Sequence, residues 1–176
     1  DSGADPKLRY QVLLNVTRTA FDSAFKSISP DSMVKFADEF STHMVDIVCN
    51  DELQVFDLIC LMQHDRYTYT HSVNVCTYTI SLANMLCDDP DADLKPIAAA
   101  AVMHDIGKRR IPGPIIRKRG ALTDEERELI QGHPVTAFEE LCMRHDVTWG
   151  SLMTVYQHHE RMDGSGYPMG LVGNEI

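Results

Sequence analysis

The sequence of 176 residues lacks the features that would place it in a membrane or in a disulfide-linked scaffold. Its longest apolar run, Ile97 to Met103, is far shorter than the roughly 20 residues that a membrane-spanning helix needs. The five cysteines are odd in number and never form a C-x-x-C pair, which argues against a disulfide framework and against a thiolate zinc site. Residues 1–6 lack the basic and apolar parts of a signal peptide and are typical of the internal edge of a longer chain. We therefore expect a cytoplasmic protein.

Positive charge is also scarce: 16 Lys and Arg residues stand against 26 Asp and Glu residues, which gives a formal net charge of -10. A chain with this charge has no overall positive field that would attract long nucleic acid. One local exception is a cationic rim directly after His104 and Asp105, formed by Lys108, Arg109, Arg110, Arg117, Lys118 and Arg119. This rim could attract a compact phosphate ester, or it could be a solvated surface loop.

Alternating strand patterns are absent, and the periodic segments favour helices, so the expected fold class is all α. Residues 7–27 carry apolar side chains at helical spacing, namely Leu8, Val12, Val16, Ala20 and Ala24. Further helices are expected at about 30–48, 50–62, 71–86, 95–104, 124–133 and 149–159. In the segment 71–86, the side chains available for burial are Val75, Ile80, Leu82, Ala83 and Leu86. Thr123 and Glu126 form a capping-box pattern that should start the helix leading to His133.

The chain divides into two parts by its content of ligand-like residues. Residues 1–62 hold no such pattern and are interpreted as an N-terminal helical extension that packs or transmits signals. Residues 63–176 are interpreted as the functional domain and contain a set of candidate metal ligands, which are His71, His104, Asp105, His133, His158 and His159. Imidazole and carboxylate suit borderline divalent metals, and this set is large enough for two. Two metals make phosphoester hydrolysis the leading reaction class.

The motifs around these residues resemble one known family. His104-Asp105-Ile106-Gly107-Lys108 is similar to the signature of the HD superfamily of metal-dependent phosphohydrolases. The chain also has His71 upstream, Gly132-His133-Pro134 downstream, and then a continuous run from His158-His159-Glu160 to Gly164-Ser165-Gly166-Tyr167-Pro168. Their order resembles that of the HD-GYP subfamily from about Asp65 to Ile176.

The resemblance implies an HD-domain helical bundle that hydrolyses cyclic di-GMP to pGpG, and onward to GMP, through a hydroxide bridging two metals. It implies that His71, His104 and Asp105 hold the first metal, that Asp105 is shared, and that His133, His158 and His159 hold the second. Iron is the expected metal, with manganese or another transition metal as the alternative. Some family members place a Glu near the position of Tyr67 and hold a third metal. Tyr67 offers no carboxylate ligand, so we expect two metals here.

Two residues are candidates for contact with the substrate. Lys108, three residues after Asp105, would stabilise charge on a phosphate oxygen by resemblance, and the alternative is a plain surface lysine. Tyr167 would contact the substrate or a partner domain, unless it is a buried tyrosine with a satisfied hydroxyl. Glu160 and Asp163 are expected to support the ligands or to end the helix. The remaining histidines, His43, His64 and His145, fall outside the motifs.

Two other functions remain open from the sequence. The domain could act on a different nucleotide or cyclic dinucleotide, or it could be a catalytically impaired signalling module that binds the dinucleotide or a partner. Family members continue into further helices that carry another ligand Asp and basic residues, so we expect this domain to be truncated at Ile176. A signalling partner could dock on the Gly164-to-Pro168 loop or on the N-terminal helices, and those helices could also form a homodimer.

Overall fold

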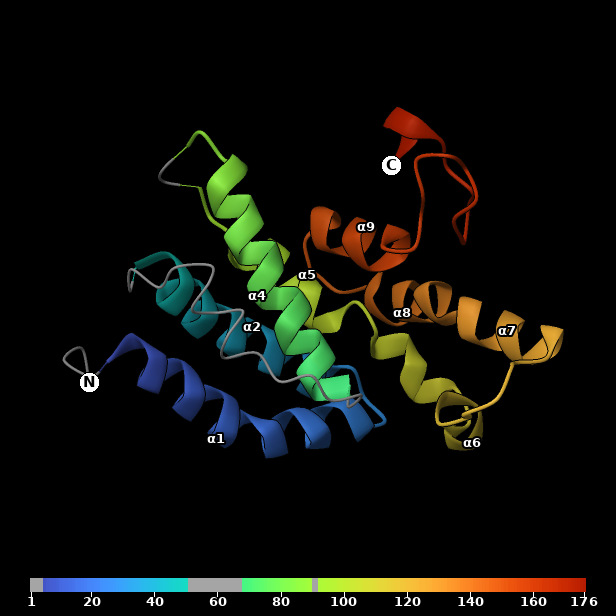
Figure 1. The fold of residues 1–176 in the computed structure, drawn as a ribbon, viewed down its shortest axis with the longest axis horizontal. Helices are drawn as coiled ribbons and strands as arrows, with labels where there is room; N and C mark the ends of the chain where they lie inside the picture. Colours follow the sequence, from blue (N-terminus) through green and yellow to red (C-terminus); the bar gives the residue numbers. More distant parts are fainter. Residues whose placement is uncertain (1–4, 51–67, 90–91) are drawn as a thin grey trace. The chain divides into compact units, whose positions relative to one another are not determined.

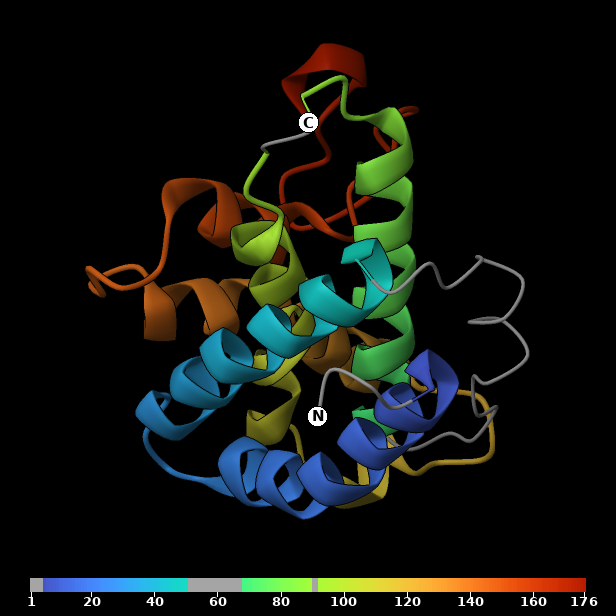
Figure 2. The same cartoon turned by 90° about the vertical axis from the view of Figure 1, so that its left-hand side faces the viewer.

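The structure is a computed structural model that describes residues 5–50, 68–89 and 92–176. The described residues form two compact units, which divide between Met103 and His104. Figures 1 and 2 show the course of the chain through its helices. The described residues are mostly helical, and their one strand-like feature is an isolated bridge between Asp163 and Val172. The all-α prediction is therefore confirmed. None of the described helices is both long enough and apolar enough to cross a membrane.

The first unit contains the longest helices. They are α1 (Pro6–Lys26), α2 (Asp31–Val45), a π-helical turn η1 (Asp46–Asn50), α4 (Thr68–Leu86) and α5 (Lys95–Met103). The start of α1 follows local rules, because Asp5 caps the amide of Lys7 and Pro6 occupies the first turn. The helix expected at 50–62 lies outside the described residues, as do Tyr67, His64 and Cys60.

An aromatic cluster joins α1, α2 and α4. The Phe21 ring meets the edges of Phe36 and Tyr69 at centroid distances of 5.6 and 5.2 Å. Helix α5 packs against both α2 and α4 (Figure 1). Its buried alanines, Ala98, Ala100 and Ala101, allow this because their small side chains let the helix backbones approach closely. The core of this unit is therefore aromatic on the side of α1 and alanine-rich on the side of α5.

The helical periodicity of α1 and α4 predicted the helices but not their buried faces. In α1 the buried side chains are Tyr10, Phe21 and Ala24, whereas Leu8, Val12 and Val16 are about half exposed or more. In α4, Ile80 is fully buried, but Leu82 and Leu86 are 57% and 72% exposed. The expected burial of Leu82 and Leu86 was therefore wrong. A period of 3.6 residues defines an apolar face, and it does not say whether that face is covered.

The second unit consists of short helices joined by turns and loops. They are η2 (Ile106–Arg110), α6 (Gly113–Ile116), α7 (Asp124–Gln131), α8 (His133–Leu141), α9 (Trp149–Gln157) and η3 (Gly173–Glu175). The predicted capping box at the start of α7 is present, since Thr123 and Glu126 each accept a hydrogen bond from the other's amide. Helix α8 packs on η2, α7 and α9.

One glycine determines how closely η2 and α8 can pack. A Cβ atom at Gly107 would lie 2.0 Å from the carbonyl oxygen of His133, far inside van der Waals contact. Only glycine permits this approach of the two backbones. The contact brings the segment after Asp105 against the start of α8, which carries His133.

Candidate metal centre

The ends of four helical segments carry the candidate ligands of the second unit. His104 and Asp105 follow α5 and precede η2, His133 begins α8, and His158 and His159 follow α9. His104, Asp105 and His133 are buried, with exposed fractions of 6%, 3% and 1%. Charged or ionisable groups are rarely buried to this degree without a partner. Their burial indicates that they act together.

The Asp105 carboxylate lies at the middle of this group. Its Oδ1 atom is 3.2 Å from Nε2 of His133 and 3.8 Å from Nε2 of His158. Its Oδ2 atom is 3.4 Å from Nε2 of His104 and accepts a 2.7 Å hydrogen bond from Nζ of Lys108. One donor atom from each of four residues lies within 4.8 Å of the others, and these residues are Asp105, His133, His158 and His159. The structure thus brings residues 105 and 159 into one cluster.

Backbone carbonyls orient two of the imidazole rings. Nδ1 of His133 lies 2.6 Å from the carbonyl oxygen of Ile130, and Nδ1 of His158 lies 2.8 Å from that of Val155. A carbonyl can only accept, so Nδ1 must carry the proton, and Nε2 of each neutral ring presents a lone pair. In both cases the carbonyl belongs to the residue three positions earlier, in the last turn of α7 or α9, where helix carbonyls have no further amide along the helix.

The resulting arrangement of acceptors fits a cation. The Nε2 atoms of His133 and His158 are only 3.1 Å apart, and both approach the carboxylate of Asp105. Lone pairs and a carboxylate facing one another repel unless a cation lies among them. Imidazole nitrogen and carboxylate oxygen are also the donors that divalent transition metals accept. The residues present therefore fit a divalent metal.

The protonation states favour metal binding as well. The Lys108 ammonium group, 2.7 Å from Oδ2 of Asp105, favours the ionised form of this carboxyl. Burial lowers the pKa of His158, and burial together with the neighbouring His158 and His133 lowers the pKa of His159 to about 4. At neutral pH the aspartate is thus ionised and these two rings are neutral, which are the forms that bind metals.

His71 lies in the first turn of α4 in the first unit, and its side chain is exposed. Its role as a ligand of the first metal stays a prediction.

The predicted substrate residues have different surroundings. Lys108 is engaged with Asp105, as given above, and lies at the edge of the cluster. The Tyr167 ring stacks on the His159 ring at a centroid distance of 4.5 Å and an interplanar angle of 20°. Burial raises the pKa of Tyr167, with a smaller contribution from the charge of Asp105. Tyr167 thus lies against a candidate ligand instead of pointing away from the cluster.

Much of the predicted cationic rim is used in ion pairs. Glu140 on α8 accepts hydrogen bonds of 2.6 Å from Arg109 and 2.7 Å from Arg110. Lys118 pairs with Glu126, the capping residue of α7. Sequence reasoning missed the role of Glu140, because its partners are about thirty residues away in the sequence and no local motif connects them.

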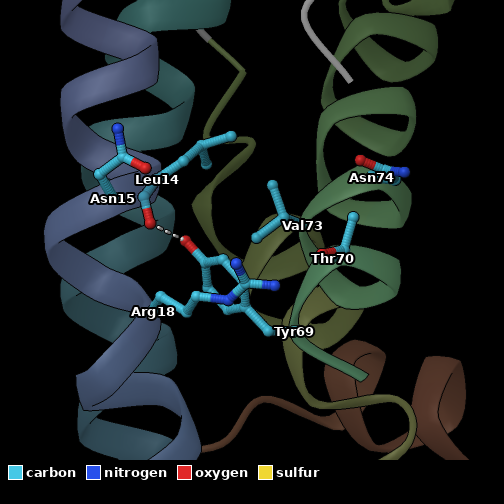
Figure 3. A pocket seen from close by; sticks show the side chains of 7 residues that line it. All are labelled: Leu14, Asn15, Arg18, Tyr69, Thr70, Val73 and Asn74. Atoms are coloured by element: carbon cyan, nitrogen blue, oxygen red, sulfur yellow. Dashed lines mark hydrogen bonds between the residues drawn. The ribbon is translucent and has the colours of Figure 1, made fainter. Parts of the chain in front are cut away.

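A hollow lies between α1 and α4 in the first unit (Figure 3). Tyr69 lines this hollow and donates a 2.6 Å hydrogen bond to the carbonyl oxygen of Leu14. The Arg18 guanidinium lies over the Tyr69 ring at 5.6 Å. The lining residues are Leu14, Asn15, Arg18, Tyr69, Thr70, Val73 and Asn74, and they include no His, Asp, Glu or Cys. Sequence reasoning assigned no function to these residues.

Comparison with known proteins places these observations in a family context. The HD domain family matches residues 55–176. The chain is 40% identical over 122 residues to the cyclic di-GMP phosphodiesterase PA4108 of Pseudomonas aeruginosa, covering 69% of this chain and 29% of that protein. It is 40% identical over 88 residues to the cyclic di-GMP phosphodiesterase response regulator RpfG of Xanthomonas campestris pv. campestris, covering 49% of this chain and 23% of that protein.

A third relative differs in its named substrate. The 3'3'-cGAMP-specific phosphodiesterase 3 of Vibrio cholerae is 37% identical over 111 residues, covering 62% of this chain and 24% of that protein. The chain thus spans less than a third of the length of each of these relatives. Among solved structures, Bd1817, an HDG"Y"P protein from Bdellovibrio bacteriovorus, matches with a TM-score of 0.75 at 18% identity, over 99% of this chain and 56% of that one. This last match supports the helical fold.

Proposed function

The chain belongs to the HD domain family, and within it to the HD-GYP subfamily, and on that premise we propose that it hydrolyses cyclic di-GMP to the linear dinucleotide pGpG and onward to GMP. The observation that carries the proposal is the convergence of neutral imidazole nitrogens on the buried Asp105 carboxylate. Relatives named as phosphodiesterases of cyclic dinucleotides supply the substrate class.

The proposed centre holds two divalent metals. His71, His104 and Asp105 would hold one metal, and His133, His158 and His159 would hold the other, with Asp105 shared between them. Bound divalent cations supply positive charge to the phosphoryl oxygens and acidify water for attack on phosphorus. Iron is our proposed metal, with manganese or another transition metal as the alternative, because these nitrogen and oxygen donors do not by themselves select one.

The residues of the chain would divide the remaining work. Nδ1 of His133 and of His158 stays hydrogen-bonded to a carbonyl, so each ring keeps one orientation and offers Nε2. Lys108 is held 2.7 Å from Asp105, where its ammonium group can shift to a phosphate oxygen and stabilise the charge that develops in the transition state. Tyr167 lies at the rim of the cluster, where it can contact the substrate.

A cytoplasmic location agrees with the described cysteines Cys49, Cys76, Cys87 and Cys142, which form no disulfide. We also propose that residues 1–62 form a signalling extension of the domain at 63–176. That extension, or the Gly164-to-Pro168 loop, would contact a partner domain or a second copy of the chain.

The test combines metal analysis with turnover. The anaerobically purified protein should contain about two metals per chain and should convert cyclic di-GMP to pGpG, resolved by chromatography. Asp105→Asn should lose both the metal and turnover, whereas Asp88→Asn, a change at an exposed loop residue, should retain both.

Two results would contradict parts of the proposal. Faster turnover of 3'3'-cGAMP than of cyclic di-GMP would show that the preferred substrate is instead the one named for the Vibrio cholerae relative. Bound metal with no turnover of either dinucleotide would favour a signalling module that binds without catalysis.

A further inference from the structure

The loop after the His158-His159 pair folds back on itself. The bridge between Asp163 and Val172 closes its neck, together with a 3.1 Å hydrogen bond from the amide of Gly173 to the carbonyl oxygen of Met162. Gly164 and Gly170, with φ angles of 75° and 66°, allow the chain to turn at the two ends of the loop. The segment 163–172 is therefore a closed loop whose ends are tied together.

Glu160 binds the returning limb of this loop. Its Oε1 atom accepts a 2.7 Å hydrogen bond from the amide of Met169, and its Oε2 atom accepts a 2.9 Å hydrogen bond from the amide of Leu171. Hydrogen bonds from amides to an ionised carboxylate are about twice as strong as neutral ones. Both oxygens of one side chain thus hold two positions of the same limb.

The outgoing limb lies directly against the backbone of the ligand pair. A Cβ atom at Gly166 would lie 2.5 Å from Cα of Glu160 and 2.6 Å from the carbonyl oxygen of His159. The next residue, Tyr167, has its amide 3.3 Å from that same oxygen. Glycine at 166 therefore lets Tyr167 reach the neighbourhood of the His159 ring.

His159 depends on this loop more than the other histidines of the cluster do. Carbonyl oxygens hold Nδ1 of His133 and of His158, but within the described chain no carbonyl holds a ring nitrogen of His159 in this way. Its contacts are with rings: His158 and His133 lie at centroid distances of 4.2 and 5.1 Å, and Tyr167 stacks at 4.5 Å. Stacking is thus the interaction that can set the orientation of this imidazole.

We propose that Glu160 is a positioning residue, which fastens the loop so that Tyr167 stacks on His159 and holds its ring in the orientation that binds metal. The inference rests on the proposed function only in taking His159 as a metal ligand. Glu160 itself is not proposed to contact the substrate or the metal. Loss of a supporting group of this kind typically costs about 10- to 100-fold in metal affinity.

The test compares Glu160→Gln with Glu139→Gln, which makes the same chemical change at an exposed glutamate of α8. In Glu160→Gln, an NH₂ group replaces one of the two acceptor oxygens. This NH₂ group cannot accept a hydrogen bond from a backbone N–H, so one of the two hydrogen bonds to the returning limb is lost. The first readout is the ring signal of His159 in the metal-free protein, measured by NMR with labelled histidine. We expect the ring-current shift from Tyr167 to disappear in Glu160→Gln and to remain in Glu139→Gln.

The second readout is a titration with Mn²⁺ in the absence of any dinucleotide. Affinity should fall about tenfold in Glu160→Gln and stay unchanged in Glu139→Gln. A wild-type ring signal together with wild-type Mn²⁺ affinity in Glu160→Gln would overturn the inference. The Mn²⁺ titration contains no substrate, so its result does not depend on turnover. If the wild-type protein binds Mn²⁺ but hydrolyses no dinucleotide in a separate assay, the proposed function is contradicted and this inference stands.

A second pair of variants covers the case in which Glu160→Gln does not fold. Tyr167→Phe keeps the stacked ring and should keep Mn²⁺ affinity, whereas Tyr167→Leu removes the ring and should lower affinity by a similar factor of about ten. Equal affinities in the Phe and Leu variants would overturn the inference, because stacking would then have no influence on the ligand.

Discussion

Both units bury polar side chains, but they do so in opposite ways. In the first unit, two buried tyrosines have hydrogen-bond partners: the Tyr69 hydroxyl lies 2.9 Å from Thr17 Oγ1 and donates to the carbonyl of Leu14, and the Tyr10 hydroxyl lies 3.1 Å from Thr77 Oγ1. In the second unit, the lone pairs of His133 and His158 and the carboxylate of Asp105 face one another. A closed set of hydrogen bonds stabilises a fold, whereas a convergence of acceptors calls for a cation.

The largest expected effect comes from preventing the close approach of η2 to α8, because this contact brings Asp105 and His133 together. Gly107→Ala would place a Cβ atom against the carbonyl of His133, so the backbones of η2 and α8 must separate. We expect a loss of about 3 kcal/mol in the free energy of unfolding, at the upper end of overpacking effects, together with loss of Mn²⁺ binding. Chemical denaturation and a Mn²⁺ titration would measure the two effects.

Gly120→Ala is the matched control for this change, since no atom lies within 4 Å of its would-be Cβ. It should leave Mn²⁺ binding as in the wild type. If Gly107→Ala bound Mn²⁺ equally well, the packing of η2 on α8 would not be needed to assemble the cluster.

The second effect is stabilisation by the metal itself. If the cluster binds Mn²⁺ only in the folded protein, Mn²⁺ at about 100 times its Kd should raise the free energy of unfolding by about 2.7 kcal/mol. Asp105→Asn should abolish the increase, because it removes the charged group to which the imidazoles converge. Thermal melts with and without Mn²⁺ provide the measurement, and an increase retained in Asp105→Asn would place the metal elsewhere.

A smaller effect should follow from removing one buried hydrogen bond of the first unit. Tyr10→Phe removes the buried contact with Thr77, whose hydroxyl still donates to the carbonyl of Val73. The free energy of unfolding should fall by about 1 kcal/mol, the usual value for one buried hydrogen bond. Mn²⁺ affinity should stay unchanged, and a substantial fall in that affinity would break the distinction drawn between the two regions.

The smallest effect at neutral pH concerns Tyr69. Burial raises the pKa of its hydroxyl from 10 to about 12, despite the opposing contributions of Thr17 and Arg18. A pKa that is higher in the folded state favours the folded protein below pH 10, and this contribution is lost as the pH rises from about 10 through 12. The free energy of unfolding should therefore decline less steeply over that range in Tyr69→Phe than in the wild type.

Tyr78→Phe, at a more exposed position of α4, is the control for the alkaline decline and should retain the wild-type slope. Equal slopes in the wild type and in Tyr69→Phe, measured by denaturation at several pH values, would contradict the assignment to Tyr69.

Features of the chain were predictable where all the interacting groups lie within one helical turn. Asp5 and Pro6 begin α1, and the capping box of Thr123 and Glu126 begins α7, because each requires only groups within three residues. The helix that delivers His104 was predicted to end at that residue, and α5 ends at Met103. The candidate ligands were predictable as residue types, since imidazole and carboxylate in the HD-GYP order already indicate metal chemistry.

Other features could not be predicted because they depend on residues far apart in the sequence. The exposure of Leu82 and Leu86 depends on what covers α4, and periodicity carries no information about that. The pairing of Arg109 and Arg110 with Glu140 joins segments about thirty residues apart, without any shared motif. The role of Glu160 also needs the returning limb of the loop to be in place.

Spacing and motifs along the chain were enough to predict the helical class, the starts of α5, α7 and α9, the family and the chemical types of the candidate ligands. These follow from spacing and from short-range hydrogen bonds along the chain. Three features emerge only from the folded chain: Nε2 of His133 and of His158 converge on Asp105, Gly107 meets His133 without a side chain, and Tyr167 lies on His159. They could not be predicted because a site is a set of distances between side chains, and the packing of separate segments sets those distances.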